Sequence, residues 1–116
     1  METPKRLILP IKKQWFDMIL SGEKKEEYRE IKSYYASRLA NYFEITTNTL
    51  IAELSELFFY GLKIEVLFRN GYSAKSPSFI ADCNLSIDCG RPEWGAEPNK
   101  KYFVFEIVDI KEVSNV

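Results

Sequence analysis

The start of the chain combines a short apolar run with a segment of helical period. Residues 6–11 (RLILPI) are mostly apolar and include β-branched members, so we predict a strand, which Pro10 restricts to a sheet edge or a strand end. Apolar side chains then recur at helical spacing over residues 12–20, which predicts a helix. Gly22 follows where a helix often ends with a left-handed residue.

Two further segments show helical spacing, and a charged segment precedes them. Residues 26–30 are predicted to be extended, and residues 32–43 to form the second helix. Residues 47–60 begin with Thr and Asn, end before Gly61, and are predicted to form the third helix. The apolar face of this third helix consists of Leu50, Leu54, Leu57 and Phe58.

After the third helix the apolar period changes from helical spacing to two. Residues 63–69 alternate and are predicted to form a strand, which ends at an Asn-Gly turn. Residues 79–89 alternate most regularly, so one face of this strand is expected to be exposed. Residues 90–101 hold two Gly and two Pro and indicate a long loop, and the mostly apolar residues 102–110 predict a well-covered final strand.

This order of elements determines the predicted fold class. Strands and helices alternate at first, and several strands then follow without crossover helices between them. We therefore predict one α+β domain over residues 1–116, built around a small, mostly antiparallel β-barrel.

The composition of the chain excludes several kinds of binding and catalysis. The chain has 116 residues, 46% hydrophobic and 28% charged, which is typical of a single globular domain. Its net charge of −1 excludes nucleic-acid binding by global charge, so any phosphate binding must be local. Histidine is absent, which removes the usual general base and the usual zinc ligand. Nothing in the sequence requires a metal, and we expect no cofactor.

The cysteines and the apolar runs indicate in which cellular compartment the protein is expected. Cys83 and Cys89 share the apolar parity of one strand, so we expect two buried thiols. Six residues of extended chain span roughly 20 Å, too far for a disulfide. No apolar run approaches the roughly 18 residues of a membrane helix, and the N-terminus lacks a secretory pattern. We therefore expect a cytoplasmic protein without a membrane partner.

Residues 21–32 (SGEKKEEYREIK) gather charges of both signs. In an extended segment Glu27 and Arg29 point to the same side. One interpretation is a solvated edge strand whose charges prevent edge-to-edge pairing. The other is that Lys24, Glu27 and Arg29 project into a cleft, where the carboxylate accepts from base amino groups and the cations bind phosphate or a carbonyl. Composition alone leaves both open.

A spaced pattern in the first third of the chain favours the second interpretation, in which the charged side chains project into a cleft. Its residues are Lys13, Trp15, Ile19, Gly22, Lys24, Glu27 and Arg29, which give W-x(3)-I-x(2)-G-x-K-x(2)-E-x-R. With the later segments 69–77 and 94–107, this pattern resembles the ASCH domain family (activating signal cointegrator homology), a branch of the PUA-like superfamily, in its small stand-alone bacterial and phage form. The resemblance covers most of the chain, and residues 44–62 match least.

The resemblance implies a β-barrel with flanking helices and a cleft lined by the G-x-K-x-x-E-x-R segment. Members of the family are thought to bind RNA or modified nucleosides, and one subgroup has been associated with RNA cleavage. Another subgroup deacetylates N4-acetylcytidine with Lys, Thr and Glu. By position its Lys falls on Lys24 and its Thr nucleophile falls on Glu27, whereas its catalytic Glu has no match.

The departure at position 27 changes the expected chemistry. A carboxylate is a poor acyl-transfer nucleophile, so the mechanism that uses Thr is not expected in this chain. Lys24 and Glu27 can instead act as an acid–base pair that positions a water, provided that burial lowers the pKa of the Lys24 amine.

Other residues are candidates for ligand binding around the same segment. They are Lys13, Trp15, Asn70, Tyr72, Ser73 and Trp94. The aromatic rings among them can stack on a base, although the helical spacing of Trp15 also indicates packing against the sheet. The amide and the hydroxyl of the turn suit a base edge. If Lys13 and Lys24 flank one groove, its local field is positive.

Three classes of function follow from these observations. The first is a binding module that holds RNA or a modified nucleoside between Lys24, Glu27 and Arg29. The second is an enzyme, either an amide hydrolase acting on an acylated nucleoside or a ribonuclease, with Lys24 and Glu27 as the catalytic pair. The third is a protein–protein adaptor, for which the helical segment 47–60 is the specific indication.

Overall fold

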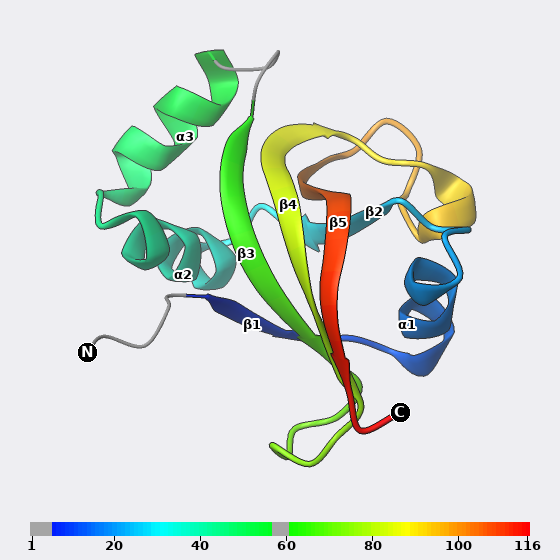
Figure 1. The fold of residues 1–116 in the computed structure, drawn as a ribbon. Coiled ribbons are helices and arrows are strands. Elements are labelled where there is room, and N and C mark those ends of the chain that lie inside the picture. The colour runs from blue at the N-terminus through cyan, green and yellow to red at the C-terminus, as the bar shows by residue number, and fades with distance from the viewer. Residues whose placement is uncertain (1–5, 57–60) are drawn as a thin grey trace.

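The computed structural model describes residues 6–56 and 61–116 (Figure 1). Its elements are β1 (Leu7–Pro10), α1 (Lys13–Leu20), β2 (Glu26–Glu30), α2 (Ser33–Phe43), α3 (Thr47–Glu56), β3 (Leu62–Arg69), β4 (Ser78–Cys89), a one-turn 3-10 helix (Pro92–Trp94) and β5 (Lys101–Ser114). The predicted helices and strands are thus present in the predicted order. Leu57 and Phe58, predicted for the apolar face of the third helix, lie outside the described residues.

The five strands form one curled sheet in the order β1-β3-β4-β5-β2. β1 and β3 run parallel, and the other neighbouring pairs are antiparallel. The sheet curls into a half-barrel (Figure 1), and β1 and β2 are its edges. The α+β class and the mostly antiparallel pairing are confirmed, whereas backbone pairing does not close the barrel.

Arginine side chains cover the free edge of β1. Arg29 of β2 donates from Nη2 to the Pro10 carbonyl at 2.8 Å, and so links the two edge strands. Arg38 of α2 donates from Nη2 to the Ile8 carbonyl at 2.6 Å. Because free carbonyls on an edge strand invite pairing with another chain, these two bonds protect the edge.

The core lies inside the curl and is covered from two sides by helices. Its fully buried strand residues are Leu9, Val66, Phe68, Phe79, Leu85, Phe103 and Phe105. Each contributes roughly 1.5–3 kcal/mol by leaving water. α1 packs on one side through Phe16, whose ring centroid lies 5.1 Å from that of Phe79. α2 and α3 cover the other side (Figure 1) and bury Leu39 and Leu50.

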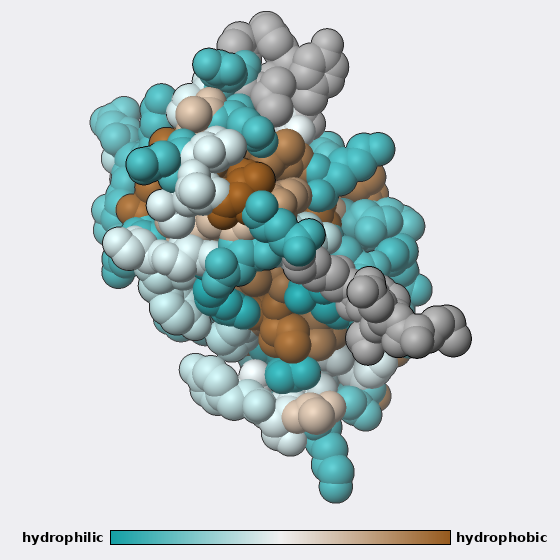
Figure 2. Space-filling model, turned by 90° about the vertical axis from the view of Figure 1, so that its left-hand side faces the viewer, coloured by the Kyte–Doolittle hydropathy of each residue, from teal (hydrophilic) through white to brown (hydrophobic). Residues whose placement is uncertain are grey.

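The face that carries α2 and α3 is largely hydrophilic. Hydrophobic atoms are visible mainly in its middle, between hydrophilic side chains (Figure 2). Apart from Tyr34, which is exposed, the outward positions of α2 and α3 are polar or small, as expected for helices that bury one stripe against a sheet.

Two predictions about the burial of strand residues are wrong near the ends of the strands. Cys83 is buried, and burial raises the pKa of its thiol to about 12, but Cys89 at the end of β4 is exposed. Both thiols are free, as predicted. β5 is well covered at residues 102–105 and mostly exposed beyond them, as at Val108. The reason is that β2 pairs with β5 only as far as Glu106, which leaves the second half at the margin of the sheet.

Candidate functional site

A tight reversal after α1 directs the charged segment back toward the sheet. Ser21 caps the helix, and Gly22 has a φ of +84°, a conformation that a side chain disfavours. The backbone N–H of Lys24 then donates to the Met18 carbonyl at 2.9 Å. β2 pairs with β5 from Glu26 onward, so α1 on one side and the sheet on the other fix the position of Lys24.

Lys24 is completely buried, with 0% of its side chain exposed. Its Nζ donates to the Trp94 carbonyl at 2.7 Å and lies 3.1 Å from Oε1 of Glu27. The same nitrogen lies 4.6 Å from the ring centroid of Trp15 and 5.0 Å from that of Tyr28. Burial lowers the pKa of Lys24, although the charge of Glu27 opposes this shift.

Glu27 links Lys24 to Arg29. Its Oε2 lies 2.7 Å from Nη2 of Arg29, so each carboxylate oxygen contacts one cation. Arg29 is also held by the Pro10 carbonyl, and its guanidinium lies 5.8 Å from the ring centroid of Tyr35. We call Lys24, Glu27 and Arg29 the buried charge cluster, since their side chains are 0%, 7% and 12% exposed. The structure brings these three predicted residues together.

A cavity of about 310 Å³ opens beside this cluster, and we call it the first cavity. Its aromatic lining consists of Trp15, Tyr28, Tyr35, Trp94 and Tyr102, and its charged lining of Glu27, Arg29, Glu30, Glu97 and Lys100. Lys24 lies behind the wall and is not among the lining residues. The lining therefore holds three acidic and two basic side chains. A positive local field was predicted for a groove flanked by Lys13 and Lys24, and this lining does not produce one.

Close packing around the 3-10 helix fixes the positions of aromatic side chains that line the first cavity. Gly95 has a φ of +100°, and a Cβ at this position would lie 3.1 Å from the ring of Trp15. The hydroxyl of Tyr28 donates to Glu26 at 2.7 Å and accepts from the backbone N–H of Arg91 at 3.0 Å. Burial raises the pKa of Tyr28, so this hydroxyl stays protonated at neutral pH.

Sequence reasoning missed several residues at the rim. Lys100 lies 3.0 Å from Oε2 of Glu30, and its hydrogen bond is the main cause of the lowered pKa of Glu30. Glu97 lies 3.7 Å from Lys100. In the loop of residues 90–101 only Trp94 was predicted as a binding residue, although the loop supplies two charged lining residues, Glu97 and Lys100. Their position depends on the pairing of β2 with β5, which the sequence pattern does not reveal.

A second cavity, of about 450 Å³, adjoins the first. It is lined by Pro10, Ile11, Lys12, Arg29, Tyr35, Asn70, Gly71 and Tyr72. Asn70 and Tyr72 were predicted from the sequence, whereas Lys12 was not singled out as a binding residue. The side-chain amide of Asn70 donates to the Ile11 carbonyl at 3.0 Å, so one of its donors holds the turn in place.

The other predicted binding residues lie apart from both cavities. Lys13 is exposed on α1, where it pairs with Asp17 at 2.6 Å. Ser73 is exposed in the β3–β4 turn, and its hydroxyl accepts from the backbone N–H of Lys75 at 3.1 Å. Neither lines the first or the second cavity.

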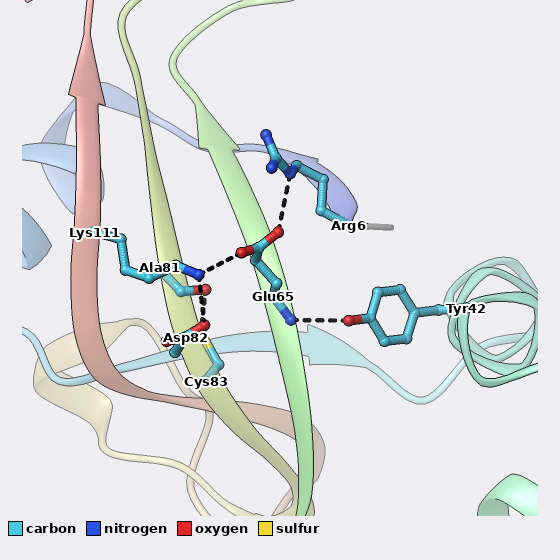
Figure 3. A network of polar contacts seen from close by, with 7 residues as sticks. All are labelled: Arg6, Tyr42, Glu65, Ala81, Asp82, Cys83 and Lys111. Atoms are coloured by element: carbon cyan, nitrogen blue, oxygen red, sulfur yellow. Dashed lines mark hydrogen bonds and ion pairs between the residues drawn. The ribbon is translucent and has the colours of Figure 1, made fainter. Parts of the chain in front are cut away.

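A separate group of charges lies across β3, β4 and β5 (Figure 3). Glu65 lies 3.1 Å from Arg6 and also pairs with Lys111, which lies 3.3 Å from Asp82. We call these four residues the surface charge cluster. A third cavity, of about 430 Å³, is lined by Glu65, Asp82 and neighbours that include Lys63 and Asn84.

Within residues 6–56 and 61–116, no group of three or more His, Cys, Asp or Glu side chains is placed to hold a metal ion. In the same part of the chain, no helix is both long enough and apolar enough to cross a membrane.

Comparison with known proteins does not extend this description. No family model matches the chain, and no curated protein or solved structure is significantly similar to it.

Proposed function

We propose that this chain is an ASCH-type domain of PUA-like fold that binds a nucleoside, free or within RNA, in the first cavity. The spaced pattern from Trp15 to Arg29 supports the family, and the curled sheet with flanking helices fits a PUA-like barrel. The observation that carries the proposal is the carboxylate of Glu27, which two cations hold in place at the wall of an aromatic cavity.

The carboxylate of Glu27 suits an amino-bearing base. A carboxylate has about four lone-pair sites, and Lys24 and Arg29 occupy one on each oxygen. The remaining sites can accept from an exocyclic amino group, in the way that Glu and Asp accept from N4 of cytosine. The two cations also remove the need for the ligand to supply a counter-charge.

The size and the walls of the first cavity fit one base or one nucleoside. Its volume of about 310 Å³ is at the lower end of the range for small-molecule sites. Its five aromatic side chains offer π-faces, and stacking on such faces is worth roughly 1–3 kcal/mol per base. The balanced charge of the lining suits a neutral base better than a chain of phosphates.

A thermal-shift panel tests this proposal. Cytidine, adenosine, guanosine, N4-acetylcytidine and uridine are added in turn, because a ligand of the folded state raises Tm. We expect a larger shift for an amino-bearing nucleoside than for uridine, whose O4 carbonyl would face the Glu27 carboxylate. A panel in which no nucleoside raises Tm would contradict the proposal.

Glu27→Gln, with Glu23→Gln as its control, identifies the residue responsible. The substitution keeps the shape of Glu27 and removes its charge, and Glu23 is an exposed carboxylate in the same segment. We expect Glu27→Gln to weaken nucleoside binding at least about tenfold, since a hydrogen bond to a charged group is worth roughly 1.5–3 kcal/mol. Glu23→Gln is expected to bind as the wild type does.

One observation favours hydrolysis as a second candidate function. Burial lowers the pKa of Lys24, which is the condition that an acid–base pair of Lys24 and Glu27 requires. In amide hydrolysis at this site, Glu27 takes a proton from water and the hydroxide adds to the acyl carbon. Glu27, which Lys24 contacts, then gives this proton to the leaving nitrogen as the C–N bond breaks, and an amine and a carboxylic acid are released. Incubation with N4-acetylcytidine and with labelled single-stranded RNA tests it, and turnover no higher than that of Glu27→Gln would exclude it.

A further inference from the structure

The first and second cavities have a common wall. Arg29 of β2 and Tyr35 of α2 line both of them, and the guanidinium lies 5.8 Å from the ring centroid of Tyr35. A group bound in the first cavity and a group bound in the second cavity can therefore both contact Arg29 and Tyr35. The two neighbouring cavities, of about 310 and 450 Å³, together offer more volume than the first cavity, which fits one nucleoside.

The two cavities differ in the charge of their lining. The first cavity has three acids and two bases in its lining. The described residues that line the second cavity include Lys12 and Arg29 and no acid. Both contacts that hold Arg29 in the cluster use Nη2, and its guanidinium carries five N–H donors in all. An anion is thus better placed in the second cavity, between Arg29 and Lys12.

Tyr72 provides an aromatic surface in the lining of the second cavity. It is 90% exposed, although the turn that carries it is well ordered by hydrogen bonds. The backbone N–H of Asn70 donates to the Pro77 carbonyl at 2.8 Å, and that of Ser73 donates to Oγ of Ser76 at 3.2 Å. A tyrosine held in the open on a fixed turn is a suitable platform for stacking a base.

Resting on the proposed function, we propose that the ligand is a nucleotide within a single strand, and that its neighbour in the strand occupies the second cavity. The phosphate that joins the two lies between Arg29 and Lys12, and the second base stacks on Tyr72. The first cavity reads one base by hydrogen bonding, and the second cavity binds the strand without choosing the base.

Competition between two kinds of probe tests this arrangement. The first probe is the nucleoside with the largest thermal shift in the panel above. The second is a fluorescein-labelled RNA hexamer of degenerate sequence, with the DNA hexamer as a parallel arm. Affinities are measured for the wild type, Tyr72→Ala, Lys12→Ala and the control Lys75→Ala, which alters an exposed lysine of the same turn that lines neither cavity.

We expect the hexamer to bind more tightly than the nucleoside. Tyr72→Ala should weaken hexamer binding about tenfold more than nucleoside binding, because one stacked base is lost. Lys12→Ala should reduce the slope of log affinity against log salt by about 0.7, the value for one phosphate of a single strand. Lys75→Ala should leave both affinities as they are. All three altered side chains are exposed, so the fold is expected to persist.

The other outcomes separate the two proposals. If the nucleoside binds as tightly as the hexamer, or Tyr72→Ala weakens both equally, the two-cavity arrangement is wrong and nucleoside binding stands. If neither probe binds, both proposals are wrong. Tighter binding of the DNA hexamer than of the RNA hexamer supports the arrangement and identifies the strand as DNA.

Discussion

The buried and the surface charge clusters contain the same kinds of side chain in different surroundings. Lys24, Glu27 and Arg29 lie under α1 and the 3-10 helix, and are at most 12% exposed. In the surface cluster Lys111 is 42% exposed and Asp82 is 49% exposed. The buried cluster comes from one short segment, whereas the surface cluster joins residues as distant as Arg6 and Lys111. The cavity beside the buried cluster has five aromatic side chains in its lining, and the cavity beside the surface cluster has one, Tyr42.

This difference separates a candidate site from ordinary surface pairing. Exposed ion pairs contribute little to stability and are screened by salt. Buried charges are costly to desolvate, and persist where geometry and hydrogen bonds compensate them. Titratable groups with perturbed pKa values in a cleft are candidates for function, and the lowered pKa of Lys24 meets this criterion next to a cavity.

Removal of one buried cation is expected to have the largest effect. Lys24→Met removes the buried ammonium that contacts Oε1 of Glu27 and donates to the Trp94 carbonyl, so both oxygens lose this partner. We expect a loss of about 3 kcal/mol, the lower end for a broken buried pair, because Arg29 still contacts Glu27. Urea unfolding measures it, with Lys111→Met as the matched change in the surface cluster. Equal losses from the two variants would show that burial does not distinguish the clusters.

The double variant Lys24→Met/Glu27→Gln sharpens this result. Part of the stability lost in Lys24→Met arises because the Glu27 carboxylate keeps its charge without its Lys24 partner. Glu27→Gln removes that charge, so it should lower the free energy of unfolding less in the Lys24→Met background than in the wild type. We expect the loss of the double variant to be smaller than the sum of the single losses. Additive losses would mean that the two side chains act independently.

The pH dependence of stability should have opposite signs in the two clusters. Burial places the folded-state pKa of Lys24 below 10.5, so the unfolded state binds more protons in that window and stability rises with pH. A hydrogen bond to Glu65 raises the pKa of Lys111 above 10.5, so its contribution is present below that pH and lost as pH rises through the folded value. Unfolding free energies of the wild type, Lys24→Met and Lys111→Met are measured up to about pH 11. The stability of the wild type relative to Lys24→Met should rise with pH, and its stability relative to Lys111→Met should fall. Parallel curves would contradict the assigned directions.

Salt should give the smallest effect. The screening length falls to about 3 Å at 1 M salt, which weakens exposed pairs much more than buried ones. The difference in stability between the wild type and Lys111→Met should therefore shrink at high salt, and the difference for Lys24→Met should persist. A loss of both differences at 1 M salt would indicate that water reaches the buried cluster.

Local patterns predicted the sheet and the helices because their causes lie within a few residues. The alternation of Ile64, Val66 and Phe68 places them on one face of β3, where all three are buried. The same alternation in residues 26–30 predicted that Glu27 and Arg29 share a side, and their side chains are in contact. By contrast, the exposure of Cys89 depends on where the sheet ends, which periodicity does not show.

The burial of Lys24 is the feature of the site that the sequence could not predict. It results from contact with Trp15 of α1 and with the Trp94 carbonyl, which is 70 residues away. The rim residues Glu97 and Lys100 likewise reach the cavity only through the long loop before β5. Such contacts follow from tertiary packing, so the spacing of charges could not decide between a solvated edge strand and a cleft.

The two tryptophans allow the most direct test of the central claim. The sequence has only Trp15 and Trp94, and both line the first cavity. In an NMR titration with the best nucleoside of the panel, both indole N–H signals should shift and saturate together. In Glu27→Gln the same shifts should require at least about tenfold more nucleoside. Saturable shifts confined to residues of the third cavity, such as Lys63 and Asn84, with both indole signals unmoved, would contradict binding in the first cavity.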